Sequence, residues 1–283
     1  MFAQVVGTGL DHLGRIAGLV VLDDVPLHAR VGRGRQDRVP VQHALADGGE
    51  SAFVFGLAFG GVVLGEYREQ AATITANESA DGIYGASVFG QQSQLILGAS
   101  FANRLAGFGG SFLDDNGAPA LDSPEAVQAA QALVDINDVA LPTPAETDFG
   151  AGNSAWFAGK VAFIENWTDL GVQTESESTA SPVAGKWGVT LLPVGEEGQE
   201  PRASLVAGFS WVIAANTDKR ELAEDFIQFA ASSEANGALL TAEPPTGIDP
   251  SRLSTLEDAT YGEKFPEIQE VNRATLSDAL AWP

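Results

Sequence analysis

The sequence predicts an α/β fold for residues 76–283, with helices packed over a mainly parallel sheet. Short apolar runs typical of buried strands alternate along this part of the chain with amphipathic segments typical of helices. Turn and cap residues separate the two kinds of segment. The 283-residue chain is 45% hydrophobic, which is enough to give two domains of ordinary size a core each.

A turn and a helix start come first. Residues 114–117 (DDNG) have turn composition, and residues 118–121 predict a short strand after them. Ser123 and Pro124 then predict a helix N-terminus, because a capping hydroxyl is followed by an early proline. Apolar residues recur on one face of this helix: Val127, Ala130, Leu133 and Val134.

A second helix and three strands follow. Residues 152–157 predict a helix that ends at Gly159, where a left-handed cap is expected. Residues 161–164 (VAFI) predict a strand buried on both faces, and residues 187–192 and 211–214 predict two more strands.

Two helices complete the pattern. The first begins at Thr217 or Asp218, and its inward positions are Leu222, Phe226, Phe229 and Ala230. The second covers residues 266–280 and has an apolar stripe of Ile268, Val271, Leu276 and Ala279.

Residues 1–79 form an anomalous N-terminal segment to which the sequence assigns no fold. The first 72 residues hold all three histidines, six of the eleven arginines and none of the four lysines. Apolar runs at 16–22 and 53–64 lack a clear period. The histidines lack metal-ligand spacing, and the arginine cluster at 30–38 fits a solvated loop better than a phosphate site. A shifted reading frame would also explain the composition.

The charge excludes several classes of partner. Acidic residues number 38 against 15 basic ones, and the net charge of −23 repels nucleic acid and anionic lipid surfaces. The absence of cysteine excludes disulfides, thiolate metal sites, a cysteine nucleophile and a cysteine lipid anchor. No run of about 18 apolar residues predicts membrane insertion, and Met1 is not followed by an export signal.

Four segments, in order, resemble a known family: GGSFLDDNGAPALDSPE at 109–125, FAGKVAFIENW at 157–167, WGVTLLP at 187–193, and AGFSWVIAA at 207–215 with ELAEDFIQF at 221–229. They are similar to family 1 of the bacterial extracellular solute-binding proteins, the maltose-binding-protein-like sugar-binding proteins of ABC transporters.

The resemblance implies a periplasmic-binding-protein-like α/β fold with two lobes, hinge strands and a ligand cleft between the lobes. Residues 80–190 would form the second lobe, 191–246 part of the first lobe, and 247–283 a return to the second lobe. The family's long first-lobe segment before residue 80 and its helices after residue 283 have no counterpart in the sequence, so an incomplete first lobe is expected.

The implied function is that of the extracellular solute-binding component of an ABC importer, which binds a neutral sugar or oligosaccharide. The expected partners are the sugar ligand and the permease subunits, and the expected location is periplasmic or extracellular, associated with the cell surface. No catalytic residue, cofactor or metal is expected. The alternatives are a carbohydrate-active hydrolase with paired carboxylates and a non-functional remnant or structural interaction module.

A sugar site needs an aromatic plate and a polar rim. The resemblance places Trp167 as the plate, with a core tryptophan as the alternative. Asn166 and Glu165 would bind hydroxyl groups, although Glu165 fits a surface charge equally well.

The resemblance places two further groups near the ligand. Gly208, Phe209 and Ser210 match a glycine loop that approaches it from the first lobe. Gln91 and Gln92 match a polar loop of the second lobe. Trp211 is expected to face the core.

Overall fold

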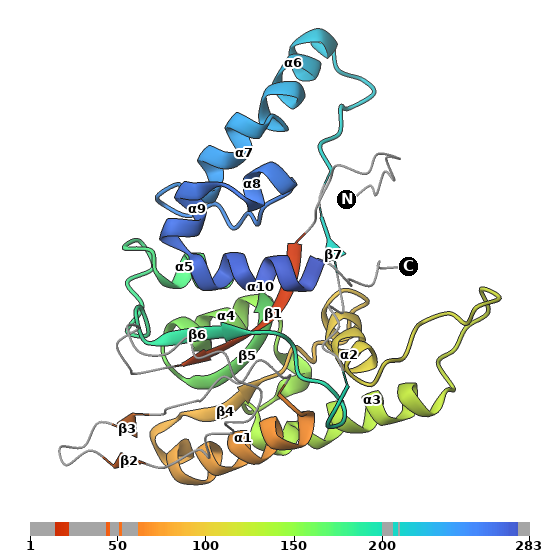
Figure 1. Ribbon diagram of the computed structural model, residues 1–283, viewed down its shortest axis with the longest axis vertical. Helices are drawn as coiled ribbons and strands as arrows, with labels where there is room; N and C mark the ends of the chain where they lie inside the picture. Colours follow the sequence, from red (N-terminus) through yellow and green to blue (C-terminus); the bar gives the residue numbers. More distant parts are fainter. Residues whose placement is uncertain are drawn as a thin grey trace.

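A mixed sheet forms the centre of the molecule (Figure 1). The computed structural model describes residues 15–22, 44–45, 51–52, 62–199, 206–208 and 210–276. The sheet has the strand order β4-β5-β1-β6, and β7 pairs with the start of β1. These strands are β1 (Arg15–Leu22), β4 (Tyr84–Ser87), β5 (Val161–Trp167), β6 (Trp187–Thr190) and β7 (Val206–Ala207).

The expectation of a mainly parallel sheet is wrong. Only β4 and β5 pair in parallel among the described strands, whereas β1 is antiparallel to β5, β6 and β7. Ala17 lies opposite Trp167, and Leu19 lies opposite Thr190. The direction changes because a strand from the start of the chain is inserted between two strands that follow it by more than a hundred residues.

The segment 1–79 therefore contains structure that its sequence did not predict. Besides β1, it holds a short hairpin of β2 (Ala44–Leu45) and β3 (Ser51–Ala52) and the helix α1 (Leu64–Glu78), which runs into a 3₁₀ turn at Ser79–Asp81. The strand β1 covers the apolar run at 16–22 and begins one residue before it. The three histidines and the arginine cluster lie outside the described residues.

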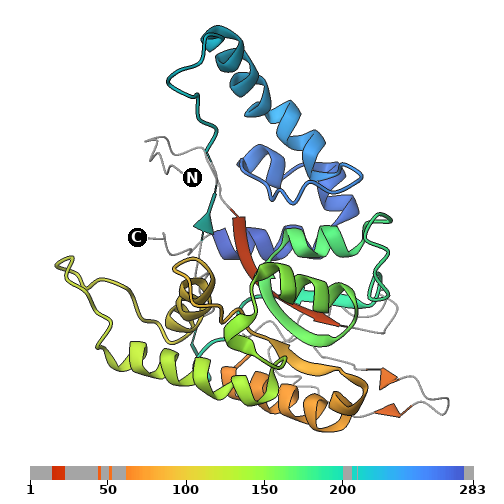
Figure 2. The same ribbon diagram turned by 180° about the vertical axis from the view of Figure 1, so that it is seen from behind.

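Helices surround the sheet and extend beyond it. They are α2 (Ile96–Gly107), α3 (Pro124–Asp135), α4 (Phe149–Phe157), α5 (Asp169–Thr174), α6 (Arg220–Ala230), α7 (Ser233–Leu240), α8 (Leu253–Leu256), α9 (Ala259–Lys264) and α10 (Pro266–Leu276). Figures 1 and 2 show α6 and α7 pointing away from the sheet, while α10 lies beside it.

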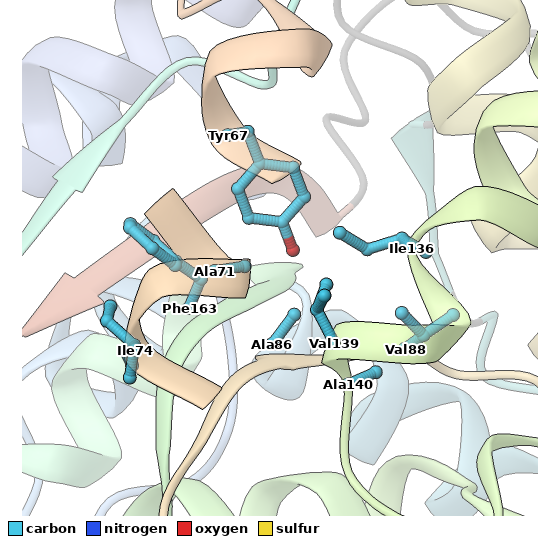
Figure 3. Packing of buried hydrophobic residues seen from close by; sticks show 10 residues of the cluster. Tyr67, Ala71, Ile74, Ala86, Val88, Ile136, Val139, Ala140 and Phe163 are labelled. Carbon is cyan, nitrogen blue, oxygen red and sulfur yellow. The ribbon is translucent and has the colours of Figure 1, made fainter. Parts of the chain in front are cut away.

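Strand β5 is buried along its whole length, and different helices cover its alternate residues. Phe163 packs edge-on against Tyr67 of α1, with ring centroids 5.3 Å apart (Figure 3). Its neighbour Ile164 belongs to a separate cluster that contains Trp156 of α4. Because successive side chains of a strand point to opposite faces, α1 and α4 cover the two faces of the sheet at β5.

Two predicted helix boundaries are confirmed. Ser123 caps α3 by accepting a hydrogen bond from the Ala126 amide at 3.2 Å. Gly159 follows α4 with a φ of 67°, in the left-handed region that glycine adopts without a steric penalty.

The apolar face predicted for α3 is only partly buried, because Leu133 packs against the cluster of Tyr67 and Phe163 while both valines are exposed. Val127 and Val134 are each 61% exposed, whereas Ala126 and Ala129 pack against Leu105 of α2. Small side chains allow the two helices to approach closely, so the alanine stripe forms the contact although it is less apolar than the valine stripe.

The C-terminal half requires further corrections. Residues 211–214 form no strand, and α6 is preceded by Lys219 rather than Thr217 or Asp218. The expected inward residues of α6 are exposed, at 65% for Leu222, 52% for Phe226 and 64% for Phe229. Trp211, expected in the core, is 61% exposed and contacts Phe226, with ring centroids 5.5 Å apart. The helix forms as its period predicts, but no described element covers its apolar face.

Shorter differences concern strand ends. Residues 118–121 contribute a single bridge, Leu113 to Pro119, and the strand expected at 187–192 ends at Thr190. The backbone amides of Asn116 and Ala118 donate to the Asp114 carboxylate, and these bonds hold the pKa of that carboxyl below its ordinary value. Within the described part of the chain, no helix is long and apolar enough to cross a bilayer.

Candidate functional site

A cavity of about 260 Å³ lies at the C-terminal end of β5. Four segments line it: α4, the end of β5, α5 and the loop 245–247 between α7 and α8. The lining residues are Phe149, Asn153, Asn166, Trp167, Asp169, Leu170, Gln173, Pro245, Thr246 and Gly247. Two of the predicted site residues, Trp167 and Asn166, are therefore brought together at one cavity.

The indole of Trp167 forms the apolar part of the wall. It is 7% exposed, packs against Ala99 of α2, and meets the Phe149 ring at a centroid distance of 4.9 Å and an angle of 69°. Phe149 in turn contacts Phe89, with ring centroids 4.8 Å apart. These contacts hold the indole in one orientation, so Trp167 is both largely buried and part of the cavity wall.

A hydrogen-bonded pair of amides forms one polar side. The Trp167 backbone amide donates to Asn166 Oδ1 at 2.8 Å, and Asn166 Nδ2 donates to Asn153 Oδ1 at 2.6 Å. On α5, Gln173 Nε2 donates to Asp169 Oδ2 at 2.8 Å. Uncharged amides thus make up much of the rim, and the described lining residues include no lysine, arginine or histidine.

A buried polar network joins Thr168, which follows β5, to Asp249, which lies two residues after the loop 245–247. Thr168 Oγ1 donates to Asp249 Oδ1 at 2.7 Å and lies 3.0 Å from Asn272 Oδ1 of α10. Asn272 Nδ2 donates to the Tyr261 hydroxyl at 3.2 Å. Burial, together with the Asp249 carboxylate, raises the pKa of that hydroxyl, so it remains protonated and able to donate.

Glu165 lies outside the cavity lining and is not a surface charge. It is 6% exposed, forms an ion pair with Arg104 of α2, and accepts a hydrogen bond from Asn103 Nδ2 at 3.2 Å. Burial, and next the Glu165 carboxylate, raises the pKa of the Tyr67 hydroxyl. Glu165 of β5 therefore faces groups of both α1 and α2 in the interior of the protein.

The remaining predicted site residues are not part of this cavity. Gln91 and Gln92 are exposed in the loop after β4, where the Gln91 amide donates to the Thr147 carbonyl at 3.1 Å. Gly208 and Ser210 are exposed as well, and Phe209 lies outside the described residues.

Sequence reasoning missed most of the lining, including Phe149, Asn153, Asp169 and Gln173. A signal existed, because Phe149 and Asn153 are four residues apart on one helix, as are Asp169 and Gln173 on another. Both helices adjoin β5, the first before it and the second after it. Within the described residues, no group of three or more His, Asp or Glu side chains could hold a metal ion.

Comparison with known proteins identifies the family to which this chain belongs. The model of the bacterial extracellular solute-binding protein family matches residues 66–237. The chain belongs to this family, which confirms the resemblance found in the sequence.

Two curated relatives match parts of the chain. A probable ABC transporter-binding protein of Deinococcus radiodurans is 34% identical over 128 residues, which cover 44% of this chain and 29% of the relative. An arabinooligosaccharide-binding protein of Halalkalibacterium halodurans is 32% identical over 173 residues, which cover 55% of this chain and 35% of the relative. The matched parts thus span about a third of the length of these relatives.

The solved structures confirm the periplasmic-binding-protein-like fold. The maltose-bound MalE3 protein of T. maritima superimposes with a TM-score of 0.71 at 24% identity, and the match covers 97% of this chain and 62% of that one. The fold seen here therefore corresponds to roughly three fifths of the solved chain.

Proposed function

We propose that this chain is the solute-binding component of an ABC importer and that it binds a neutral sugar or polyol at the Trp167 cavity. The observation that carries the proposal is an indole fixed beside uncharged amides, in a cavity whose described lining includes no cationic side chain. An aromatic face stacks on the apolar face of a sugar ring, while amides bind its hydroxyl groups. Family membership and the names of the two relatives support the same function.

The size of the cavity supports binding of a single ring. Its volume of about 260 Å³ lies just below the usual range for drug-sized ligands, roughly 300–1,000 Å³. A longer saccharide would place one residue against Trp167 and extend outward. Gly208, Phe209, Ser210, Gln91 and Gln92 are then proposed to contact the ligand outside the cavity.

We retain the two-lobe organisation as part of the proposal. Residues 80–190 and 247–283 would form the second lobe, and residues 191–246 part of the first. The packing of α10 against β1 and β6 supports this division, as does the projection of α6 away from the sheet (Figure 2). In this arrangement β1 and β7 would connect the lobes, and ligand binding would favour closure.

A binding protein is favoured over a glycoside hydrolase. Hydrolysis by the usual mechanism needs two carboxylates about 5–10 Å apart across the bond that breaks. Asp169 is the only carboxylate among the described lining residues, and Gln173 already binds it. We therefore propose that the ligand leaves unchanged, for delivery to permease subunits at the outer surface of the membrane or in the periplasm.

Calorimetric titration with maltose, L-arabinose, an arabino-oligosaccharide, D-mannitol and ribitol tests the proposal. We expect saturable binding of at least one compound, with no product in the recovered ligand. Trp167→Leu should abolish this binding because it removes the stacking face, whereas Trp211→Phe should retain it because Trp211 lies outside the cavity. Product formation would support the hydrolase, and no binding by the folded protein would support the remnant.

A further inference from the structure

The amide groups of the cavity have only one orientation that satisfies their fixed neighbours. A backbone N–H can only donate, so the atom 2.8 Å from the Trp167 amide must be the Asn166 oxygen. The Asn166 Nδ2 group then points at Asn153, whose nearer atom at 2.6 Å must be an oxygen. The chain of bonds leaves Asn153 Nδ2 as the donor on this side of the cavity.

The opposite constraint acts on α5. A carboxylate can only accept, so the Gln173 atom 2.8 Å from Asp169 Oδ2 must be the amide nitrogen. Gln173 Oε1 is then the group left to accept. A donor-only group orients one amide and an acceptor-only group orients the other, so the two walls differ in polarity.

We infer that Asn153 and Gln173 determine ligand specificity, with Asn153 donating to an oxygen of the ligand and Gln173 accepting from a hydroxyl group. This inference rests on the proposed function and adds the selection rule. A hydroxyl group accepts and donates and therefore satisfies both walls. A ligand carboxylate has no proton for Gln173 and meets the Asp169 charge, and a ligand ammonium cannot accept from Asn153.

Substitutions at Asn153 test the donor. Asn153→Asp still accepts from Asn166 but cannot donate, and Asn153→Leu removes the amide without adding charge. For whichever of maltose, L-arabinose, D-mannitol, ribitol or the arabino-oligosaccharide the unaltered chain binds, we expect each variant to raise Kd about tenfold or more. Asn137→Asp, the same chemical change at an exposed position outside the cavity, should change Kd less than twofold.

A substitution at Asn166 tests the relay, by which Asn166 sets the orientation of the Asn153 amide. In Asn166→Asp, the new carboxylate accepts from the Trp167 amide and also from Asn153. Asn153 must then turn its nitrogen toward that carboxylate and present its oxygen to the ligand. We expect a loss of binding similar to that of Asn153→Asp, although Asn153 is unchanged. Gln173→Met should also weaken binding about tenfold because it removes the acceptor.

The outcomes separate this inference from the proposed function. Circular dichroism first establishes that each variant is folded. If the unaltered chain binds a compound and both Asn153 variants bind it within twofold, Asn153 does not select the ligand, while the proposed function stands. If Asn153→Asp loses binding but Asn166→Asp does not, the relay is wrong. If the unaltered chain binds none of the compounds, both proposals fail.

Discussion

The ion pair of Arg104 and Glu165 places two charges in the interior of the protein, between α2 and β5. Their side chains are 2% and 7% exposed, and Asn103 adds a hydrogen bond to the carboxylate. Two buried charges require each other, because removing one leaves the other without compensation in a medium of low polarity. The role of Glu165 is therefore one of stability, and it aligns β5 with α2.

Glu165→Gln should destabilise the fold by about 3–5 kcal/mol, because the Arg104 charge stays buried without its partner. Chemical denaturation measures the change. Glu257→Gln breaks the exposed pair with Arg273 and serves as the control, with no measurable effect expected because solvent already screens these charges. A Glu165→Gln variant as stable as the unaltered chain would show that the buried pair does not stabilise the fold.

At the cavity, the family resemblance predicted the two residues that end a recognisable strand, but not the lining residues of the neighbouring helices. Trp167 and Asn166 follow an apolar run whose burial is visible in its composition. Asn153 becomes a lining residue only because α4 packs on β5, and that contact depends on tertiary structure. Glu165 belongs to the same strand, but its buried partner Arg104 lies 61 residues earlier in the chain. The role of Glu165 could therefore not be inferred from its neighbours in the sequence.

Among the elements, β4 and α1 are packed with no space between their backbones. A Cβ atom added to Gly85 would lie 2.0 Å from the Ala71 carbonyl oxygen of α1. A side chain at this position would require α1 to move away from the sheet, and this movement would separate Tyr67 and Ile74 of α1 from the strand residues of the cluster in Figure 3. Glycine therefore sets the distance between the helix and the strand.

Gly85→Ala should destabilise the protein by about 1–3 kcal/mol, as overpacking of a core typically does. Gly65→Ala provides the matched control, because no atom lies within 4 Å of the added Cβ and the residue is exposed in α1. Alanine favours the helix there by up to about 1 kcal/mol. Denaturation midpoints should thus shift in opposite directions, and a neutral Gly85→Ala would contradict the close packing.

Local signals predicted those elements whose boundaries depend on a few neighbouring residues. The Ser123 cap and the Gly159 termination depend on hydrogen bonds and backbone angles within one turn. Strand β1 could not be predicted in this way, since its partner residues in β5 lie about 150 positions away. Its apolar run was visible, but only pairing makes it the strand that reverses the direction of the sheet.

Considered as a whole, the molecule divides into a packed sheet region and a projecting helical region (Figure 1). The sequence predicted an apolar face on α6, and the face exists. Helical periodicity shows that such a face is present, but it does not show whether another element packs against it. Leu222, Phe226 and Phe229 lie exposed together, and Trp211 extends the same surface through its contact with Phe226. Contiguous apolar surface of this kind is typical of sites of association.

We therefore expect the chain to self-associate through α6 as its concentration rises. Replacing Leu222, Phe226 and Phe229 together by glutamine should lower the average mass seen in sedimentation velocity and reduce the binding of an apolar dye. The free energy of unfolding should change by no more than about 0.5 kcal/mol for each exposed position, because these side chains contribute little to the core.

Val127→Gln and Val134→Gln on α3, which are also exposed, provide the control and should leave the mass distribution unchanged. If the α6 variant were as associated as the unaltered chain, the contact would lie elsewhere; if it lost several kcal/mol, its apolar face would be buried in solution.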